Sequence, residues 1–208
     1  MIDFCILGSG ISGSTIANLI SKKYTVQVFE KAKGAGGRAS TRKYKDNLSF
    51  DHGAQYISTK NKSFKKFLNL YRKKKYIKLW NKNHLDFNFK KCSSEKFIGK
   101  KGNNDISKHL LKGIKVQFSS EIKNINFTKN YWVITFKNNK RDKFKYLVLT
   151  CPFPQLKKLA SKYLNKKILK LNVKMKPNIT VMAAYQGYKG ISISSLKFND
   201  DIISWAAN

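Results

Sequence analysis

The chain contains little arginine and little acid, and these shortages limit its possible partners. Only four of its 43 basic residues are arginines, and its 11 acidic residues leave a formal net charge of +32. Proteins that read nucleic acids use arginine for bidentate and stacking contacts, and the lysines here are scattered along the whole chain. This pattern indicates compositional drift, that is, a general bias towards lysine in an otherwise ordinary fold. It predicts no specific nucleic-acid partner. The alternative, a basic protein that binds nucleic acid or an anionic membrane surface, stays open.

Cysteine and long apolar runs are also scarce. Cys5, Cys92 and Cys151 lie far apart, without the spacing of a disulfide framework or a metal site. We therefore expect no metal and a reducing, cytoplasmic setting. No apolar run approaches the length of a membrane span, and Asp3 interrupts any apolar leader. The sequence thus predicts neither a membrane segment nor a signal peptide.

The N-terminal residues predict one βαβ unit. Residues 2–7 form an apolar run that is typical of a buried parallel strand. The apolar residues of 16–20 have helical spacing, and residues 24–29 form a second strand. A strand, a glycine turn, a helix and a strand in this order predict an α/β fold with a Rossmann-type domain.

Further elements are expected along the remaining chain. Strands are predicted over residues 116–118, 131–136, 146–149, 179–185, 191–193 and 202–205. Helices are predicted over residues 64–71 and 156–171 and around 109–111, the last capped by Asp105 or Ser107, and residues 72–105 read as irregular. Asn138-Asn139 is a candidate hairpin turn. Because a domain rarely ends directly after a strand, we expect the chain to be a truncated fragment.

A glycine motif follows the first strand. In Gly8-x-Gly10-x-x-Gly13, the first glycine permits the tight turn, the second lets a pyrophosphate approach the backbone, and the third lets the helix pack closely. The start of the helix at Ile11 and Ser12 then offers amide donors and the positive end of the helix dipole. The motif therefore predicts a dinucleotide site.

Two features after the second strand specify this site further. Glu30 lies at the position where a carboxylate accepts the ribose hydroxyls of an adenosine, and Lys31 follows it. Gly36-Gly37-Arg38 supplies a second flexible loop and a cation for the pyrophosphate. A site that binds only a nicotinamide dinucleotide does not need this second loop. Glu30 and the Gly36-Gly37-Arg38 loop together therefore favour FAD.

These motifs, with Phe50-Asp51-His52-Gly53-Ala54-Gln55-Tyr56, resemble the renalase-like branch of the flavin amine oxidase superfamily. Weaker similarity continues through Phe97-Ile98-Gly99, the segment 147–152 and Ser204-Trp205-Ala206-Ala207-Asn208. The resemblance implies an FAD-binding Rossmann-like domain at 1–57 and 106–152. It also implies a discontinuous, incomplete substrate domain at 58–105 and 153–208, with a mixed or antiparallel sheet.

The same resemblance implies an activity. It predicts hydride transfer to FAD from a small organic donor, an aberrant NAD(P)H isomer or an amine-like substrate, with O2 as acceptor. No residue of the chain decides between these donors, no catalytic residue is assigned, and the oligomeric state is open. The expected cofactor-binding residues are Gly8, Gly10, Ile11, Ser12, Gly13, Glu30, Lys31, Gly36, Gly37, Arg38, Gly53, Ala54, Gln55, Tyr56 and Ile122.

One departure leaves an alternative open. In such flavoproteins a late Gly-Asp segment and a final helix close over the flavin, and nothing in this sequence corresponds to them. A truncated or degenerate nucleotide-binding protein without catalysis is therefore the main rival hypothesis.

Overall fold

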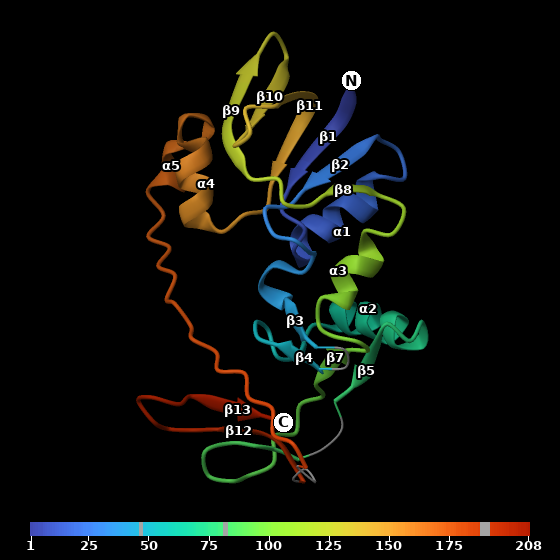
Figure 1. The fold of residues 1–208 in the computed structure, drawn as a ribbon, viewed down its shortest axis with the longest axis vertical. Helices are drawn as coiled ribbons and strands as arrows, with labels where there is room; N and C mark the ends of the chain where they lie inside the picture. The colour runs from blue at the N-terminus through green and yellow to red at the C-terminus, as the bar shows by residue number, and fades with distance from the viewer. Residues whose placement is uncertain (46–47, 81–82, 188–191) are drawn as a thin grey trace.

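A six-stranded sheet forms the largest unit of the computed structural model, which describes residues 1–45, 48–80, 83–187 and 192–208 (Figure 1). Its strands are β1 (Ile2–Leu7), β2 (Val26–Phe29), β8 (Lys115–Gln117), β9 (Ile122–Thr128), β10 (Tyr131–Phe136) and β11 (Arg141–Leu149). The order is β8-β2-β1-β11-β10-β9; the first four strands are parallel, and β10 is antiparallel to β9 and β11. The predicted Rossmann-like α/β fold is confirmed.

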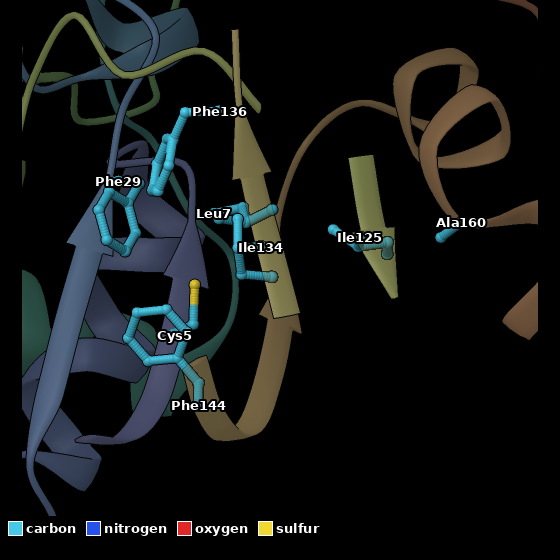
Figure 2. Close-up of a cluster of buried hydrophobic side chains, with 8 residues drawn as sticks. All are labelled: Cys5, Leu7, Phe29, Ile125, Ile134, Phe136, Phe144 and Ala160. Atoms are coloured by element: carbon cyan, nitrogen blue, oxygen red, sulfur yellow. The ribbon is translucent and has the colours of Figure 1, made fainter. Parts of the chain in front are cut away.

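Both faces of β1 are buried, as its continuous apolar run predicts. Successive side chains of a strand point to opposite faces. Cys5 and Leu7 therefore pack into one cluster, whereas Ile6 packs with Ala17 of α1 (Ile11–Ile20) in another. Figure 2 shows the first cluster, which is made of Cys5, Leu7, Phe29, Ile125, Ile134, Phe136, Phe144 and Ala160.

Four more α-helices follow α1 along the chain within the described residues. They are α2 (Lys62–Lys73), α3 (Asp105–Leu110), α4 (Phe153–Ala160) and α5 (Lys166–Leu169), with short 3-10 turns at η1 (Gly37–Ala39) and η2 (Ser161–Tyr163). The single helix predicted over 156–171 is wrong, because the Asn165 side chain accepts from the Lys167 amide and starts α5 as a separate helix. The predicted caps of α3 are also wrong: no side chain caps this helix, and Asp105 accepts instead from the Lys101 amide.

Short strands lie below the large sheet in Figure 1. They are β3 (Thr41–Tyr44), β4 (Leu48–Asp51), β5 (Ile77–Leu79), β6 (Asn83–Leu85), β7 (Phe97–Gly99), β12 (Ile193–Lys197) and β13 (Trp205–Ala207). β3 pairs with β4, and β5 with β7. β12 is antiparallel to β13 and parallel to β6, which is the mixed sheet that was predicted. The irregular reading of 72–105 is wrong, since β5, β6 and β7 lie there but are too short to show periodicity.

The C-terminal strand predictions fail in part. Residues 179–185 are mostly apolar but form no strand, and Ile179 and Val181 are 93% and 86% exposed. A strand needs a paired neighbour for its backbone groups, and these residues pair with none in the described chain. The strand predicted at 202–205 is largely wrong: residues 202–204 form no strand, and β13 covers Trp205–Ala207. For 191–193, Ile191 lies outside the described residues and β12 begins at Ile193.

The described residues contain no helix that is long and apolar enough to cross a membrane.

Candidate cofactor-binding site

The glycine turn after β1 is fixed by contacts within the chain at two of its three glycines. Gly8 has a φ of +106°, which glycine adopts readily. A Cβ on Gly13 would lie 2.0 Å from the Gly8 carbonyl oxygen, so the close approach of α1 to the turn requires glycine there. Thr150, just after β11, donates its hydroxyl to the Leu7 carbonyl at 2.9 Å and braces the same turn.

Gly10 differs, because nothing within the chain requires it to be glycine. Its φ of −69° and ψ of −179° are ordinary extended values. A Cβ there would lie 3.7 Å from Gly37 Cα and 3.8 Å from the Gly36 oxygen, which is normal van der Waals contact. No side chain caps α1 and no acidic residue lies in its first turn. The first-turn amides therefore remain available to an anion.

The second glycine loop lies directly against the first. The Gly36 amide donates to the Ser9 carbonyl at 3.1 Å, and Gly10 and Gly36 form a parallel bridge. Gly37 has a φ of +55°, and a Cβ on it would lie 3.1 Å from Gly10 Cα. The absence of a side chain at Gly37 therefore lets the second loop come this close to the first.

Glu30 faces the glycine turn from the end of β2. It is 8% exposed, and its Oε2 accepts from both the amide and the hydroxyl of Ser9, each at 2.9 Å. Its Oε1 accepts from the Ala32 amide at 2.9 Å. An ionised carboxylate has about four acceptor positions, so one remains for a ribose hydroxyl. Lys31, the next residue, is exposed.

The later motif residues reach this site through Arg38. The Ala54 amide donates to the Arg38 carbonyl at 2.7 Å, and a Cβ on Gly53 would lie 2.1 Å from the same oxygen. The side-chain amide of Gln55 donates to the Gly53 carbonyl at 3.3 Å. The Arg38 side chain itself is exposed.

Two expected residues lie farther from the glycine loops. Ile122 begins β9 and packs against the core, and the Ser120 amide before it donates to the Glu30 carbonyl at 2.9 Å. The Tyr56 ring instead packs beside Trp80, with 6.1 Å between the ring centroids. The structure therefore brings the two glycine loops, Glu30 and the 53–54 turn together, and it places Tyr56 towards the short strands.

The 53–56 segment is held by a residue that the sequence reasoning missed. Asn103 is 1% exposed, and its side-chain amide donates to the carbonyls of Ala54 and Gln55 at 2.7 and 2.9 Å. Its side-chain oxygen accepts from the Gly99 amide at 2.8 Å. In the sequence, Asn103 is one polar residue in the stretch Lys-Gly-Asn-Asn, which matches no motif. Nothing in the sequence therefore indicated this role.

Replacing Asn103 is expected to destabilise the protein strongly. Asn103→Ala removes three buried hydrogen bonds and leaves two carbonyls and one amide unsatisfied, which costs about 3 kcal/mol or more of unfolding free energy. Urea unfolding followed by tryptophan fluorescence measures the change. The exposed Asn88→Ala is the control; a loss below ~1 kcal/mol in Asn103→Ala, similar to that control, contradicts the assigned role.

A cavity of about 390 Å³ lies beside the second glycine loop. It is lined by Arg38, Pro152, Phe153, Val173, Lys174, Met175 and Lys176. Cys151, just before this lining, is half-buried, and this burial raises the pKa of its thiol. His52 forms a 3.2 Å hydrogen bond with Ser40 through Nε2, as a structural histidine does. Among the described residues, no cluster of three or more His, Cys, Asp or Glu could hold a metal ion.

Comparison with known proteins identifies the family. The NAD(P)-binding Rossmann-like domain profile matches residues 6–71, and the profile for flavin containing amine oxidoreductase matches residues 82–189, more than half of the chain. The chain belongs to the flavin-containing amine oxidoreductase family. Mouse (Mus musculus) renalase is 25% identical over 170 residues, which are 77% of this chain and 50% of that protein. The chain thus spans about half the length of the renalase that it matches.

Solved structures support the fold. A putrescine oxidase with redesigned cofactor binding superposes with a TM-score of 0.62 at 10% identity, covering 81% of this chain and 62% of its own. Tetracycline destructase Tet(51) gives a TM-score of 0.53 at 11% identity over 80% of this chain and 42% of its own. At these identities the similarity shows the fold alone.

The residues present fit a flavin dinucleotide. Asn104 is 8% exposed, and its side-chain oxygen is buried without a hydrogen-bond partner among the described residues. This side chain touches the second glycine loop: a Cβ on Gly36 would lie 2.7 Å from Asn104 Cβ. A buried acceptor without a donor is unfavourable, so the protein offers a hydrogen-bond acceptor beside the loops where a hydroxyl-rich ligand would lie.

Proposed function

We propose that this chain binds FAD and belongs to an oxidoreductase that transfers a hydride from a small organic donor to the flavin, with O2 as acceptor. The observation that carries the proposal is the Ser9-Gly10 turn, where Gly10 contacts the Gly36-Gly37 loop although its own conformation does not require glycine, and where Glu30 accepts from the Ser9 amide. A second loop and Arg38 beside the first favour the pyrophosphate and ribityl chain of FAD over NAD.

In this proposal the protein binds and orients, and the flavin supplies the redox chemistry when bound. The amides at the start of α1 and the Arg38 guanidinium hold the pyrophosphate. Glu30 accepts from the adenosine ribose, and the Asn104 oxygen accepts from a cofactor hydroxyl. Asn103 keeps the Gly53–Gln55 backbone in place beside Arg38.

For the donor we propose an aberrant NAD(P)H isomer, in which the nicotinamide carries its hydride at an unusual ring position. Similarity to renalase over half of that protein's length supports this choice over an amine. The competing hypothesis is nucleotide binding without catalysis.

Anaerobic flavin reduction tests the proposed function. The FAD-loaded protein is mixed separately with an NADH isomer, with standard NADH and with benzylamine, and the visible flavin absorbance is recorded. We expect fast bleaching with the isomer alone. If only benzylamine bleaches the flavin, the donor is an amine and not an NADH isomer. If FAD is bound but none of the three compounds reduces it, the hypothesis of nucleotide binding without catalysis is supported.

The net charge of +32 leads to a separate expectation. If the lysines are compositional drift, binding to duplex DNA is weak, independent of sequence and steeply reduced by salt, because it arises from counterion release alone. Titration of labelled duplexes of different sequence near physiological salt measures this. Tight binding that discriminates between sequences would instead establish a nucleic-acid partner.

A further inference from the structure

Lys96 is a buried lysine whose amine forms no hydrogen bond or ion pair within the described part of the chain. It directly precedes β7 and is 4% exposed, and its Nζ has no hydrogen-bond acceptor among the described residues. The neighbouring Phe97 packs into the apolar cluster with Leu68 and Ile77. Since side chains alternate along an extended segment, Lys96 points away from this cluster. Lysine is rarely buried unless it is paired, so this position calls for an explanation.

One aromatic ring lies against the amine, and further rings pack next to that ring. Lys96 Nζ lies 5.3 Å from the centroid of the Tyr56 ring, within the range of a cation–π contact. Tyr56 packs beside Trp80, whose backbone amide donates to the Lys96 carbonyl at 2.8 Å. Trp205 of β13 also packs against Trp80, with 6.3 Å between the ring centroids. Lys96, Tyr56 and Trp80, here called the Lys96 cluster, thus join the cofactor motif to the short strands.

The nearby polar groups do not serve as partners of the amine. Both ring nitrogens of His84 are occupied, by the Ser195 hydroxyl at 2.8 Å and the Trp80 carbonyl at 2.9 Å. The carboxylate of Glu95, the preceding residue, pairs with Lys65 at 2.8 Å. Among the described residues, the Lys96 amine is therefore buried without a carboxylate beside it.

Burial lowers the pKa of Lys96 below that of an ordinary lysine; the nearby Lys197 lowers it further, and Cys92 acts in the opposite direction. An anion beside Nζ would favour the charged ammonium and raise this pKa again. Binding of an anion at Lys96 is therefore coupled to uptake of a proton.

We propose that the Lys96 cluster binds the oxyanion of a small planar substrate, with the ammonium of Lys96 paired to a carboxylate or phosphate ester and the rings of Tyr56 and Trp80 packed against the ligand plane. Calling the ligand a substrate rests on the proposed function, because Tyr56 ends the motif expected to contact FAD. Entry to the buried amine requires a change of side-chain rotamer, which is common at binding surfaces.

Calorimetry on the whole chain without added FAD tests the proposal with two probes, benzoate and phenyl phosphate, at mildly alkaline pH. Titrations in two buffers of different ionisation enthalpy report the protons taken up. We expect proton uptake in the wild type, and Lys96→Met should abolish it and weaken both probes at least ~10-fold, the loss of one charge-assisted contact. Exposed lysines are already protonated, so binding to them takes up no proton.

Lys78→Met is the matched control, because Lys78 is exposed on β5, which pairs with β7; it should retain the affinity and the proton uptake of the wild type. Lys96→Met is expected to raise the thermal midpoint, since it removes a buried unpaired amine, and near-ultraviolet circular dichroism checks its fold. A tighter benzoate complex identifies a carboxylate ligand, and a tighter phenyl phosphate complex a phosphate ester.

Either of two results overturns the proposal: unchanged affinity in Lys96→Met, or binding of neutral benzamide as tight as that of benzoate. Failure here is distinct from failure of the proposed function. If the protein takes up a proton on binding the probes in a way that depends on Lys96 but does not bind FAD, the anion site stands and the proposed function fails. If the protein binds FAD but Lys96→Met does not change probe binding, the proposed function stands and the anion site fails.

Discussion

Gly10→Ala is expected to lower FAD affinity at least ~100-fold while leaving the fold unchanged. Within the chain the new Cβ meets only ordinary contacts, 3.7 Å from Gly37 Cα. It would, however, occupy the surface on which the pyrophosphate approaches the α1 amides. Losing two hydrogen bonds to a charged group costs about 3–6 kcal/mol, and each ~1.4 kcal/mol is tenfold in affinity. Gly10→Val should have a larger effect.

Fluorescence titration of FAD measures the affinity, and thermal unfolding measures the stability. Gly13→Ala is the contrasting variant, because its Cβ would lie 2.0 Å from the Gly8 oxygen and should destabilise the protein itself. If Gly10→Ala binds FAD as the wild type does, the pyrophosphate does not lie at this turn.

Glu30→Gln is expected to weaken FAD binding ~10- to 100-fold, the effect of removing about 1.5–3 kcal/mol of charged hydrogen bonding to the ribose. Glutamine keeps the shape and one side-chain acceptor, so the contact with Ser9 can persist. Glu30→Ala should weaken FAD more. It should also lower stability, because the buried amide of Ser9 and the part-buried amide of Ala32 lose their acceptor.

Flavin mononucleotide provides the control for Glu30, because it lacks the adenosine ribose. Its affinity, measured by the same fluorescence titration, should be the same in the wild type and in Glu30→Gln. If FAD affinity does not change, or if both flavins weaken together, Glu30 only braces the end of the strand and the adenosine lies elsewhere.

The N-terminal part of the fold was predictable because its signals are local. The apolar run at 2–7, the spacing of Gly8, Gly10 and Gly13, and the acid at the end of the next strand each specify their own structure. The contact between the two glycine loops was not predicted, because the sequence indicated only that the second loop would lie against the pyrophosphate.

The remaining features depend on contacts between distant segments. Asn103 holds carbonyls 48 and 49 positions away, and no pattern in the sequence marks such a partner. The predicted strand at 179–185 failed for the related reason that a run of apolar residues does not show whether a pairing strand exists. Lys96 was one of many lysines in the sequence, and only its burial distinguishes it.

The identity of the bound dinucleotide tests the central claim most directly. The protein is purified without added cofactor and denatured, and the released ligand is identified by mass and by its visible spectrum. We expect FAD, retained by the wild type and reduced in Gly10→Ala. Release of NAD(P) alone, or FAD content indifferent to Gly10→Ala, would contradict the assignment of this site to FAD.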